Sequence, residues 1–545
     1  MNITTKLDNL NQDLIEQYLT ALGISDVKHF LKPVNANFES WKNYKNMREA
    51  VALLNKHQNP DTKFGILVDS DADGACSAAI VYKFLNSDNC QTFFHTGKQH
   101  GLKDTVDRIL EANLDLLFIP DAGSNDVNEC KRLQESGVDI IILDHHLIEE
   151  ENPYACVVNN QVEGVENKAL SGAGVTDKFV QAFCDINKYK YGVDIPSFYD
   201  LVAVSLVSDI CDLSTMENRG YIYRGLRSIT NPFLSLLFEK LCQRRGYTPD
   251  GIGWNIAPLA NALARSDEQE SKTLFFDGLV GKISPEEALK QMRRVKRLQD
   301  EEVKAVVEEI EPNLDVSSKV ILGFTEPQNA SFTGLIANKF NGKYNKPTLL
   351  LRDTGYNSWS GSLRSPVPLA TKINESGLAS AQGHEEACGI LVKKNNLDKF
   401  QKWLETLDLS ESPDIQVTAQ VNPEDITLDV CQVITDCKQL WGHGIEAPTF
   451  YIKTILTQDD VYVFEKSTTT IKLDLNGLSC LKFFAKPQDV KAFNQYDKFN
   501  LELIVGDLSI NEYNGYTTPQ CNIIDYEISS VIDSQEIDDN WEEWF

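Results

Sequence analysis

The sequence has little of what marks secreted or membrane proteins. Its 12 cysteines form no CxxC pair and follow no regular spacing, so no disulfide framework is indicated. No apolar run approaches the roughly 20 residues that span a bilayer. The opening stretch, MNITTKLDNLNQDLIEQYL, is acidic and polar, unlike a signal peptide. We therefore expect a cytoplasmic protein with reduced thiols and no membrane partner.

Basic residues are also scarce. The chain has 52 Lys and Arg against 80 Asp and Glu, a net charge of −28 over 545 residues. Taken alone, this argues against a nucleic-acid partner, because phosphate binding usually requires a basic surface. A basic groove can still lie on an acidic body, and bound cations invert the local field. The length is sufficient for several domains, each with its own core.

An unusual acidic cluster follows the first strong apolar run. Residues 65–80 read GILVDSDADGACSAAI and place Asp69, Asp71 and Asp73 at alternate positions. The pattern D-x-D-x-D-G could open a calcium-binding EF-hand loop. That loop needs a Glu at its twelfth position and a preceding helix, whereas this chain has Ile80 there and a predicted strand, KFGILV, before it. The EF-hand interpretation therefore fails.

Two later apolar runs end in the same way. LDLLFIPDAG ends at Asp121, and GVDIIILDHH ends at Asp144, His145 and His146. Helical segments separate the runs, which is typical of a parallel α/β sheet, and such sheets bind ligands at the carboxyl ends of their strands. A fourth acid, Asp209, follows FYDLVAVSLVSD, whose apolar spacing is helical.

Four such clusters at one edge would repel each other unless cations neutralised them. Oxygen ligands with one or two imidazoles suit manganese or magnesium better than structural zinc. We predict two divalent metal ions, with Mn²⁺ preferred or Mg²⁺. The alternative is an ordinary helix-cap or loop role for each acid, which explains any single cluster better than all of them together.

With these motifs the chain resembles the DHH phosphoesterase superfamily, and within it the RecJ-like exonucleases. DSDADG, PDAG, DHH and SLVSDI match the four motifs, and IAPLANALARSDE, GSLRS, GHEEACGI and LWGHGIEAPTF resemble later segments in the same order. The resemblance covers nearly the whole chain. There are departures: HTGKQHGL replaces an arginine- and tyrosine-containing pattern, Asn329 lies where the family often has histidine, and QGH replaces a double glycine before His384.

The resemblance implies roles for individual residues. Asp69 and Asp144 would not bind metal themselves but would orient the ligands that do. Asp121 would bridge the two ions, and His146 would contact the scissile phosphate. The implied metal ligands are Asp71, Asp73, Asp121, His145 and Asp209. The implied substrate-binding residues are Lys98, Asn261, Arg265, Ser362, Arg364, Ser365 and His384. The helix opening at 74–77 is expected to point its amide groups at the site.

The implied fold class is α/β, with a parallel-sheet DHH catalytic domain, a DHH-associated α/β domain joined by a long helix, and a C-terminal OB-fold β-barrel. Ser284 and Pro285 are expected to begin the long helix, with Glu287 completing a capping box. The predicted segments are 1–45 (N-terminal helices), 46–225 (catalytic), 226–313 (helical connector), 314–408 (DHH-associated), 413–530 (OB-fold) and 531–545 (tail).

Three further features carry weaker expectations. The basic stretch of the long helix at Arg293, Arg294, Lys296 and Arg297 is either a strand contact or a solvated face. Hairpins are predicted at 476–477 and 514–515. Nearby aromatics are base-stacking candidates, although we expect at least half to be core: Phe483, Phe484, Tyr513 and Tyr516.

The chain ends in EIDDNWEEWF, which is similar to the tails of bacterial single-strand-binding proteins. Such a tail would recruit a replication or repair protein; the alternative is a disordered solubilising tail.

The resemblance implies a monomeric, metal-dependent exonuclease that degrades single-stranded DNA 5′→3′ to 5′-mononucleotides in repair, recombination or replication. The polarity comes from the resemblance alone. One alternative is a DHH phosphodiesterase of short oligonucleotides or cyclic dinucleotides, which usually lacks the OB-fold. Another is a non-catalytic replication scaffold, in which metal ligands would have been lost.

Overall fold

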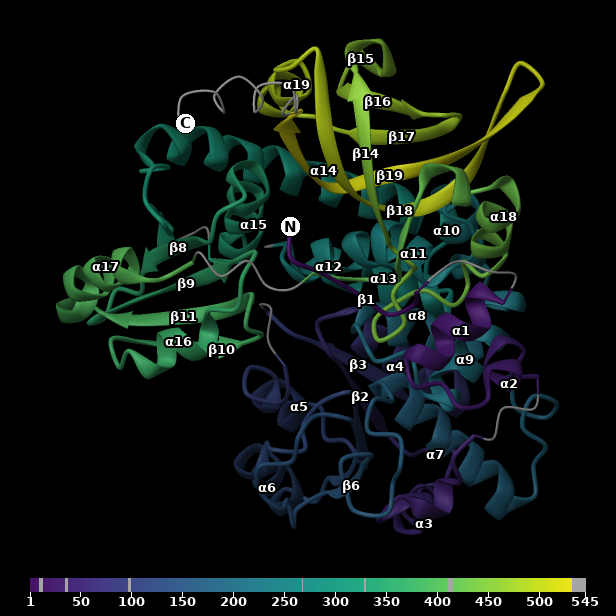
Figure 1. Ribbon diagram of the computed structural model, residues 1–545. Coiled ribbons are helices and arrows are strands. Elements are labelled where there is room, and N and C mark those ends of the chain that lie inside the picture. Colours follow the sequence, from purple (N-terminus) through teal and green to yellow (C-terminus); the bar gives the residue numbers. More distant parts are fainter. Residues whose placement is uncertain are drawn as a thin grey trace, which may run out of the picture.

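The computed structural model describes residues 1–8, 13–34, 38–96, 100–266, 268–327, 330–409 and 415–531. The predicted tail after residue 531, Lys98 and Asn329 lie outside these ranges. The α/β fold class is confirmed, with a parallel-sheet domain, a second α/β lobe and a C-terminal β-domain arranged around a central group of helices (Figure 1).

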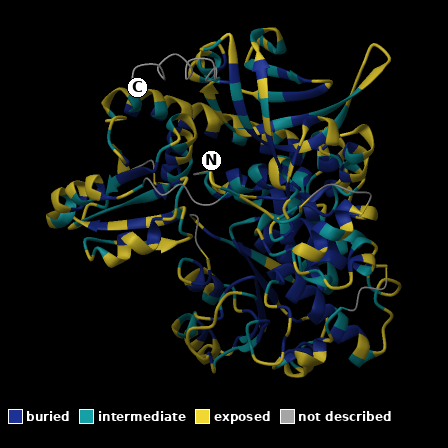
Figure 2. Ribbon diagram, viewed as in Figure 1, coloured by how far each residue is buried: buried dark blue, intermediate teal, exposed yellow. Residues whose placement is uncertain are grey.

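The first domain is built on a five-stranded parallel sheet of order β3-β2-β4-β5-β6. Its strands are β2 (Phe64–Val68), β3 (Cys90–Phe94), β4 (Leu116–Pro120), β5 (Asp139–Asp144) and β6 (Cys156–Asn159). The central strands are buried along their length (Figure 2), because helices cover both faces. One face packs on α3 (Met47–Lys56), α4 (Ala72–Leu85) and α7 (Gly172–Asn187), and the other on α5 (Val106–Glu111) and α6 (Val127–Glu135).

A helical connector follows the sheet and ends in the longest helix. Its helices are α8 (Tyr199–Ser208), α9 (Met216–Arg227), α10 (Pro232–Leu241), α11 (Pro249–Gly251), α12 (Ala257–Ala264), α13 (Gln269–Val280) and α14 (Pro285–Ile310), with a π-helix at Ile252–Ile256. Ser284 is the N-cap of α14, and its hydroxyl accepts a hydrogen bond from the Glu287 amide at 3.3 Å. Pro285 occupies the first helical position, as expected.

The second lobe is a five-stranded sheet of order β10-β11-β9-β8-β7. Its strands are β7 (Ile321–Thr325), β8 (Thr348–Asp353), β9 (Ser358–Arg364), β10 (Ala379–Gly383) and β11 (Ala387–Lys393). Only the β7–β8 pair is parallel among these described strands. The lobe's helices are α15 (Thr333–Tyr344), α16 (Ala370–Glu375) and α17 (Leu397–Thr406).

The C-terminal β-domain has seven strands in the order β13-β14-β18-β19-β17-β16-β15. They are β13 (Ala419–Val421), β14 (Phe450–Thr457), β15 (Val461–Glu465), β16 (Thr469–Leu475), β17 (Leu478–Phe483), β18 (Lys498–Tyr513) and β19 (Tyr516–Ser530), with helices α18 (Leu428–Asp436) and α19 (Pro487–Phe493). Both predicted hairpins form, and the asparagine and glycine of each turn have positive φ, as a type I′ turn requires.

One expectation about this domain is wrong. None of the four candidate stacking aromatics belongs to the core: Phe483, Phe484, Tyr513 and Tyr516 are 45, 77, 71 and 78 % exposed. Their positions at a strand end and a hairpin tip account for this, because the side chains there extend past the residues that pack beneath the sheet.

The N-terminal segment packs against the C-terminal domain. Strand β1 (Ile3–Thr5) pairs in parallel with β12 (Ile415–Val417), and helices α1 (Leu14–Ala21) and α2 (Val27–Leu31) share a core with β13 and β14. Chain segments about 400 residues apart in sequence therefore lie side by side (Figure 1). Within the described ranges, each helix is too short or too polar to span a membrane.

Candidate active site

The carboxyl edge of the parallel sheet gathers the predicted acids and histidines. Strand β2 is followed by the Asp69–Asp73 cluster, β4 by Asp121, and β5 ends at Asp144 before His145. Because β2, β4 and β5 are adjacent and parallel, their ends meet at one edge. Helix α8 ends here as well and presents Asp209 at its C-cap.

The Nε2 atom of His145 lies at the centre of this group. It is 3.1 Å from Asp121 Oδ1, 3.6 Å from Asp209 Oδ2 and 3.8 Å from Asp73 Oδ2. Asp121 Oδ1 and His145 Nε2 are both buried, and neither has a hydrogen-bond partner among the described residues. A divalent cation would satisfy both atoms, and the donor set of carboxylate oxygens and imidazole suits Mn²⁺ or Mg²⁺. The residues present therefore fit the predicted metal.

The carboxylates repel each other strongly. Burial and the charges of Asp73, Asp71, Asp69 and Asp209 raise the pKa of Asp121 well above its ordinary value. Burial and Asp73 likewise raise the pKa of Asp209 to about 6.

Asp73 is fixed by the start of α7, where the sequence LSGAGVTDKFVQAF resembles a family segment, although the contact itself was not predicted. Its Oδ2 accepts a hydrogen bond from the Gly172 amide, and its Oδ1 from the Ala173 amide, both at 2.9 Å at the start of α7. The Ser205 hydroxyl donates to the same carboxylate at 2.7 Å. A Cβ on Gly172 would lie 2.4 Å from Asp121 Oδ1, so only glycine allows this approach.

The expectation that the backbone amides of residues 74–77 point at the site needs correction. Helix α4 begins after Asp71, and the Gly74 amide donates to the Asp71 side chain at 3.1 Å. That amide is therefore occupied by an N-cap bond. The amides that reach an acid of the central group are those of α7.

Asp69 lies between two histidines that the sequence reasoning did not assign. Its Oδ1 is 3.1 Å from His95 Nε2, and its Oδ2 bonds to His100 Nδ1. The other ring nitrogen of His95 is 2.7 Å from Asp104 Oδ1. Although burial opposes it, hydrogen bonds from His100 and His95 hold the pKa of Asp69 below its ordinary value. Both histidines lie in HTGKQHGL, the segment that departs from the family pattern.

Asp144 orients the two histidines that follow it. Its Oδ1 accepts bonds from the His145 amide at 2.7 Å and from His146 Nδ1 at 2.8 Å, and its Oδ2 accepts from the Ser124 amide at 3.1 Å. The bond from Asp144 raises the pKa of His146 to about 9. The exposed His146 ring therefore carries positive charge at neutral pH beside the acidic group.

The predicted substrate-binding residues divide into two groups. Arg265 follows α12, and Arg364 lies at the end of β9. Burial first, and then the charge of Arg364, lowers the pKa of Arg265. Each guanidinium donates to one nearby backbone carbonyl, that of Asn261 or Leu363. No carboxylate of the described residues forms an ion pair with either arginine, which leaves donors available for an anion.

The other substrate-binding candidates of the second lobe differ in their contacts. The Ser362 hydroxyl lies 3.2 Å from that of Thr333 at the start of α15. Ser365 is buried, and its hydroxyl bonds to the backbone of Val367 within a turn. His384 is exposed in the four-residue turn that joins β10 to β11. Ser365 is thus engaged in the turn, whereas Arg265 and Arg364 have no acidic partner among the described residues.

Comparison with family models identifies two domains. Residues 63–206 match the DHH family, N-terminal domain, and residues 417–525 match the RecJ OB domain. The first match contains the whole carboxylate edge except Asp209, and the second contains strands β13 to β18 and most of β19.

The chain is also similar to individual proteins. The SPbeta prophage-derived protein YorK of Bacillus subtilis is 28% identical, over 96% of this chain and 97% of its own. The single-stranded-DNA-specific exonuclease RecJ of Thermus thermophilus is 26% identical over 66% of this chain and 54% of its own. The structure of that organism's RecJ in complex with Mn²⁺ has a TM-score of 0.73 at 19% identity, covering 97% of this chain and 80% of that one.

Proposed function

Since the chain is RecJ-like, with a DHH family N-terminal domain and a RecJ OB domain, we propose that it is a metal-dependent exonuclease for single-stranded DNA. It would hydrolyse phosphodiester bonds from the 5′ end and release 5′-mononucleotides, acting in repair, recombination or replication. The polarity and the product follow from the resemblance to RecJ.

The main support for this proposal comes from two buried atoms, Asp121 Oδ1 and His145 Nε2. They lie 3.1 Å apart among further carboxylates, and neither has a hydrogen-bond partner in the described part of the chain. Asp73 and Asp209 would complete one cation site with these atoms. Asp69, Asp71 and His100 form a neighbouring group of possible ligands. When bound, two divalent ions supply charge neutralisation for the phosphate and lower the pKa of the attacking water.

The other residues would prepare the substrate for that chemistry. The α7 amides hold the Asp73 carboxylate in one orientation, so its position need not change during the reaction. The His146 imidazolium, fixed by Asp144, would contact a non-bridging phosphate oxygen. Arg265 and Arg364 would grip the terminal phosphate or the backbone through their planar forks.

The experiment that tests this function is degradation of one single strand, labelled at either end in separate reactions, with Mn²⁺. Mononucleotides should appear from the 5′ end only, and Asp73→Asn should abolish them. Asp139→Asn is the matched control, because Asp139 begins β5 at the opposite edge of the sheet.

A double-stranded DNA and a dinucleotide complete the design. Cleavage of the dinucleotide alone would contradict the exonuclease proposal and favour a short-oligonucleotide phosphodiesterase. Absence of both Mn²⁺ binding and cleavage would favour a non-catalytic scaffold.

A further inference from the structure

A groove runs along one polar face of α14. It encloses about 370 Å³ and is lined by Leu259 of α12 and by six charged residues of α14: Arg293, Lys296, Arg297, Asp300, Glu301 and Lys304. These six follow the i, i+3, i+4 spacing of a single helix face. At 1.5 Å per residue the face extends for roughly 16 Å. The other side of α14 is buried against the connector through residues such as Met292 and Val295.

The groove has the opposite charge to the protein. Four of its lining residues are basic and two are acidic, in a chain whose net charge is −28. Arg297 and Lys296 pair with Glu301 and Asp300 one turn later. No carboxylate of the described part of the chain forms an ion pair with Arg293. Lys304 pairs with Glu308, which lies outside the lining. The lining itself therefore keeps two more basic than acidic side chains.

The position of the groove connects it to Arg265. Leu259 belongs to α12, the helix that carries Asn261 and leads directly into Arg265. Arg265 and Arg364 are both proposed above to bind phosphate. A strand held at Arg265 would pass Leu259 before it reaches the basic residues of α14.

We propose that this face of α14, here named the α14 groove, binds the sugar–phosphate backbone of the single strand beyond the nucleotides at the active site. The inference rests on the proposed function, because it takes the strand that the active site would degrade as the occupant. Single-strand grooves of this kind combine cations that track the backbone with a tolerance for any base sequence. Of the two interpretations of the basic stretch of α14, the proposal favours contact with the DNA strand over a solvated helix face.

Binding can be measured separately from cleavage. The probe is a fluorescent single strand of about 20 nucleotides, with EDTA to prevent hydrolysis, and the Kd is measured by anisotropy at several salt concentrations. Arg293→Gln/Arg297→Gln should weaken binding about tenfold. It should also reduce the slope of log K against log salt by about 1.4, since each lost phosphate contact accounts for about 0.7 on single strands.

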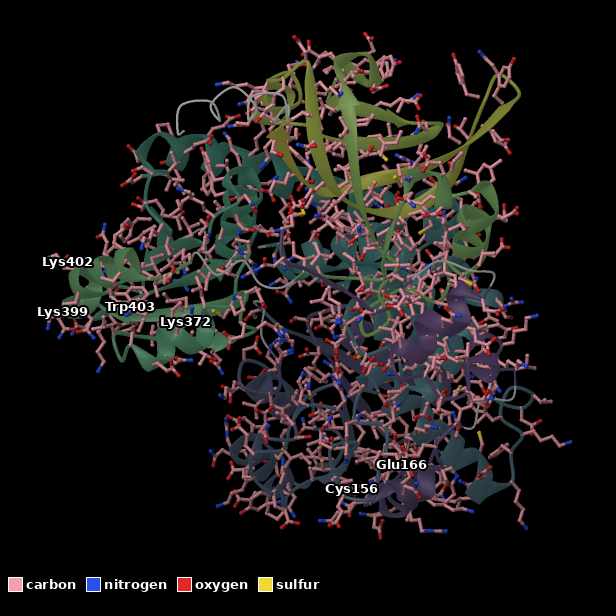
Figure 3. The ribbon with its side chains drawn as sticks, viewed as in Figure 1. Cys156, Glu166, Lys372, Lys399, Lys402 and Trp403 are labelled. Carbon is pink, nitrogen blue, oxygen red and sulfur yellow. The ribbon has the colours of Figure 1, made fainter. Side chains whose placement is uncertain are left out.

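A second variant, which removes negative charge instead of positive charge, distinguishes lost DNA contacts from local unfolding. Asp300→Asn/Glu301→Gln removes the two acids of the same face and should tighten binding about threefold, which local unfolding cannot do. The control is Lys399→Gln/Lys402→Gln on α17, whose side chains lie at the far edge of the second lobe (Figure 3). Glutamine is a good helix former, and asparagine and aspartate have similar helix propensities, so all three variants should keep their helices.

The two proposals fail in different ways. A Kd and a salt slope equal to wild type in both groove variants would overturn the α14 groove, whatever the wild type does to DNA in Mn²⁺. Absence of cleavage by wild type in Mn²⁺, with groove-dependent binding intact in EDTA, would overturn the exonuclease proposal and leave the α14 groove supported.

Discussion

The carboxylate edge of the parallel sheet and the part of the second lobe that contains Arg364 and His384 are built in opposite ways. At the edge, Asp73 and Asp121 are only 1 and 2 % exposed, and two adjacent backbone amides at the start of α7 fix Asp73. In the second lobe, Arg364 is half-buried and donates to one neighbouring carbonyl, and His384 is exposed. The carboxylate edge is therefore fixed before any ligand binds, whereas the second lobe keeps hydrogen-bond donors free.

The difference follows from what each region would bind. A metal ion requires ligands within a few tenths of an ångström of fixed positions, so the acids are held rigidly even though burial and mutual repulsion make them costly. A flexible strand offers phosphates at variable positions, so long cationic side chains with unused donors suit it better. The following predictions test whether the two regions can be perturbed independently.

The largest effect is expected from Asp121→Asn at the carboxylate edge. Asparagine tolerates the positive φ of 68° at this position, so the backbone should be kept while one charge is lost. We expect Mn²⁺-dependent degradation to fall by at least about 1,000-fold, since the shared ligand of a metal site is removed. Thermal unfolding without metal should shift upward, because the remaining acids are less repelled.

Mn²⁺ titration of wild type and of Asp121→Asn gives a second measurement. The cation should raise the unfolding temperature of wild type, by an amount equivalent to about 2.7 kcal/mol at 100 times its Kd, and should barely move that of Asp121→Asn. An equal Mn²⁺ stabilisation of both proteins would mean that Asp121 is not a metal ligand.

Gly172→Ala should have an intermediate effect. The added Cβ would lie 2.4 Å from Asp121 Oδ1 and must displace that carboxylate or the start of α7, which also holds Asp73. We expect a loss of about 1 to 3 kcal/mol in stability from overpacking, together with an activity loss of roughly 100-fold. Metal affinity should fall as well, which calorimetry with Mn²⁺ can measure.

Gly342→Ala provides the matched control. Gly342 lies in α15 of the second lobe, and a Cβ there would meet no atom within 4 Å. This substitution should stabilise the protein by about 0.4 to 1 kcal/mol and leave Mn²⁺ affinity as in wild type. A similar drop in Mn²⁺ affinity for both glycine variants would refute the steric account.

Much of this organisation could be predicted from the sequence. The carboxylate edge could be assigned because each apolar run ends in its own acid or histidine, and parallel strands bring those ends together. The contribution of α7 could not, because Gly172 and Ala173 reach Asp73 across about 100 residues and have no side chain that indicates the contact.

His95 and His100 were missed for a different reason. Their approach to Asp69 depends on the path of the loop between β3 and α5, which no periodic pattern determines. For Phe484 and Tyr516, alternation predicts the strands but does not show where the underlying core stops, so their exposure could not be deduced.

The smallest effect is expected from Arg364→Lys in the second lobe. Lysine keeps the charge but loses the planar fork that binds phosphate with two hydrogen bonds. We expect kcat/KM on single-stranded DNA to fall about tenfold, mainly through KM, as one charge-assisted hydrogen bond of about 1.5 to 3 kcal/mol is weakened. The Mn²⁺-induced shift in unfolding temperature should equal that of wild type, since no metal ligand changes.

Arg352→Lys is the matched control, because Arg352 lies on the neighbouring strand β8, opposite Ser360 and not opposite the end of β9. It should change KM less than twofold, on the order expected of a surface cation away from the phosphate. A reduced Mn²⁺ shift in Arg364→Lys would show that the second lobe helps to form the metal site. The two regions would then act as one site, and the contrast between a fixed edge and an adaptable lobe would no longer hold.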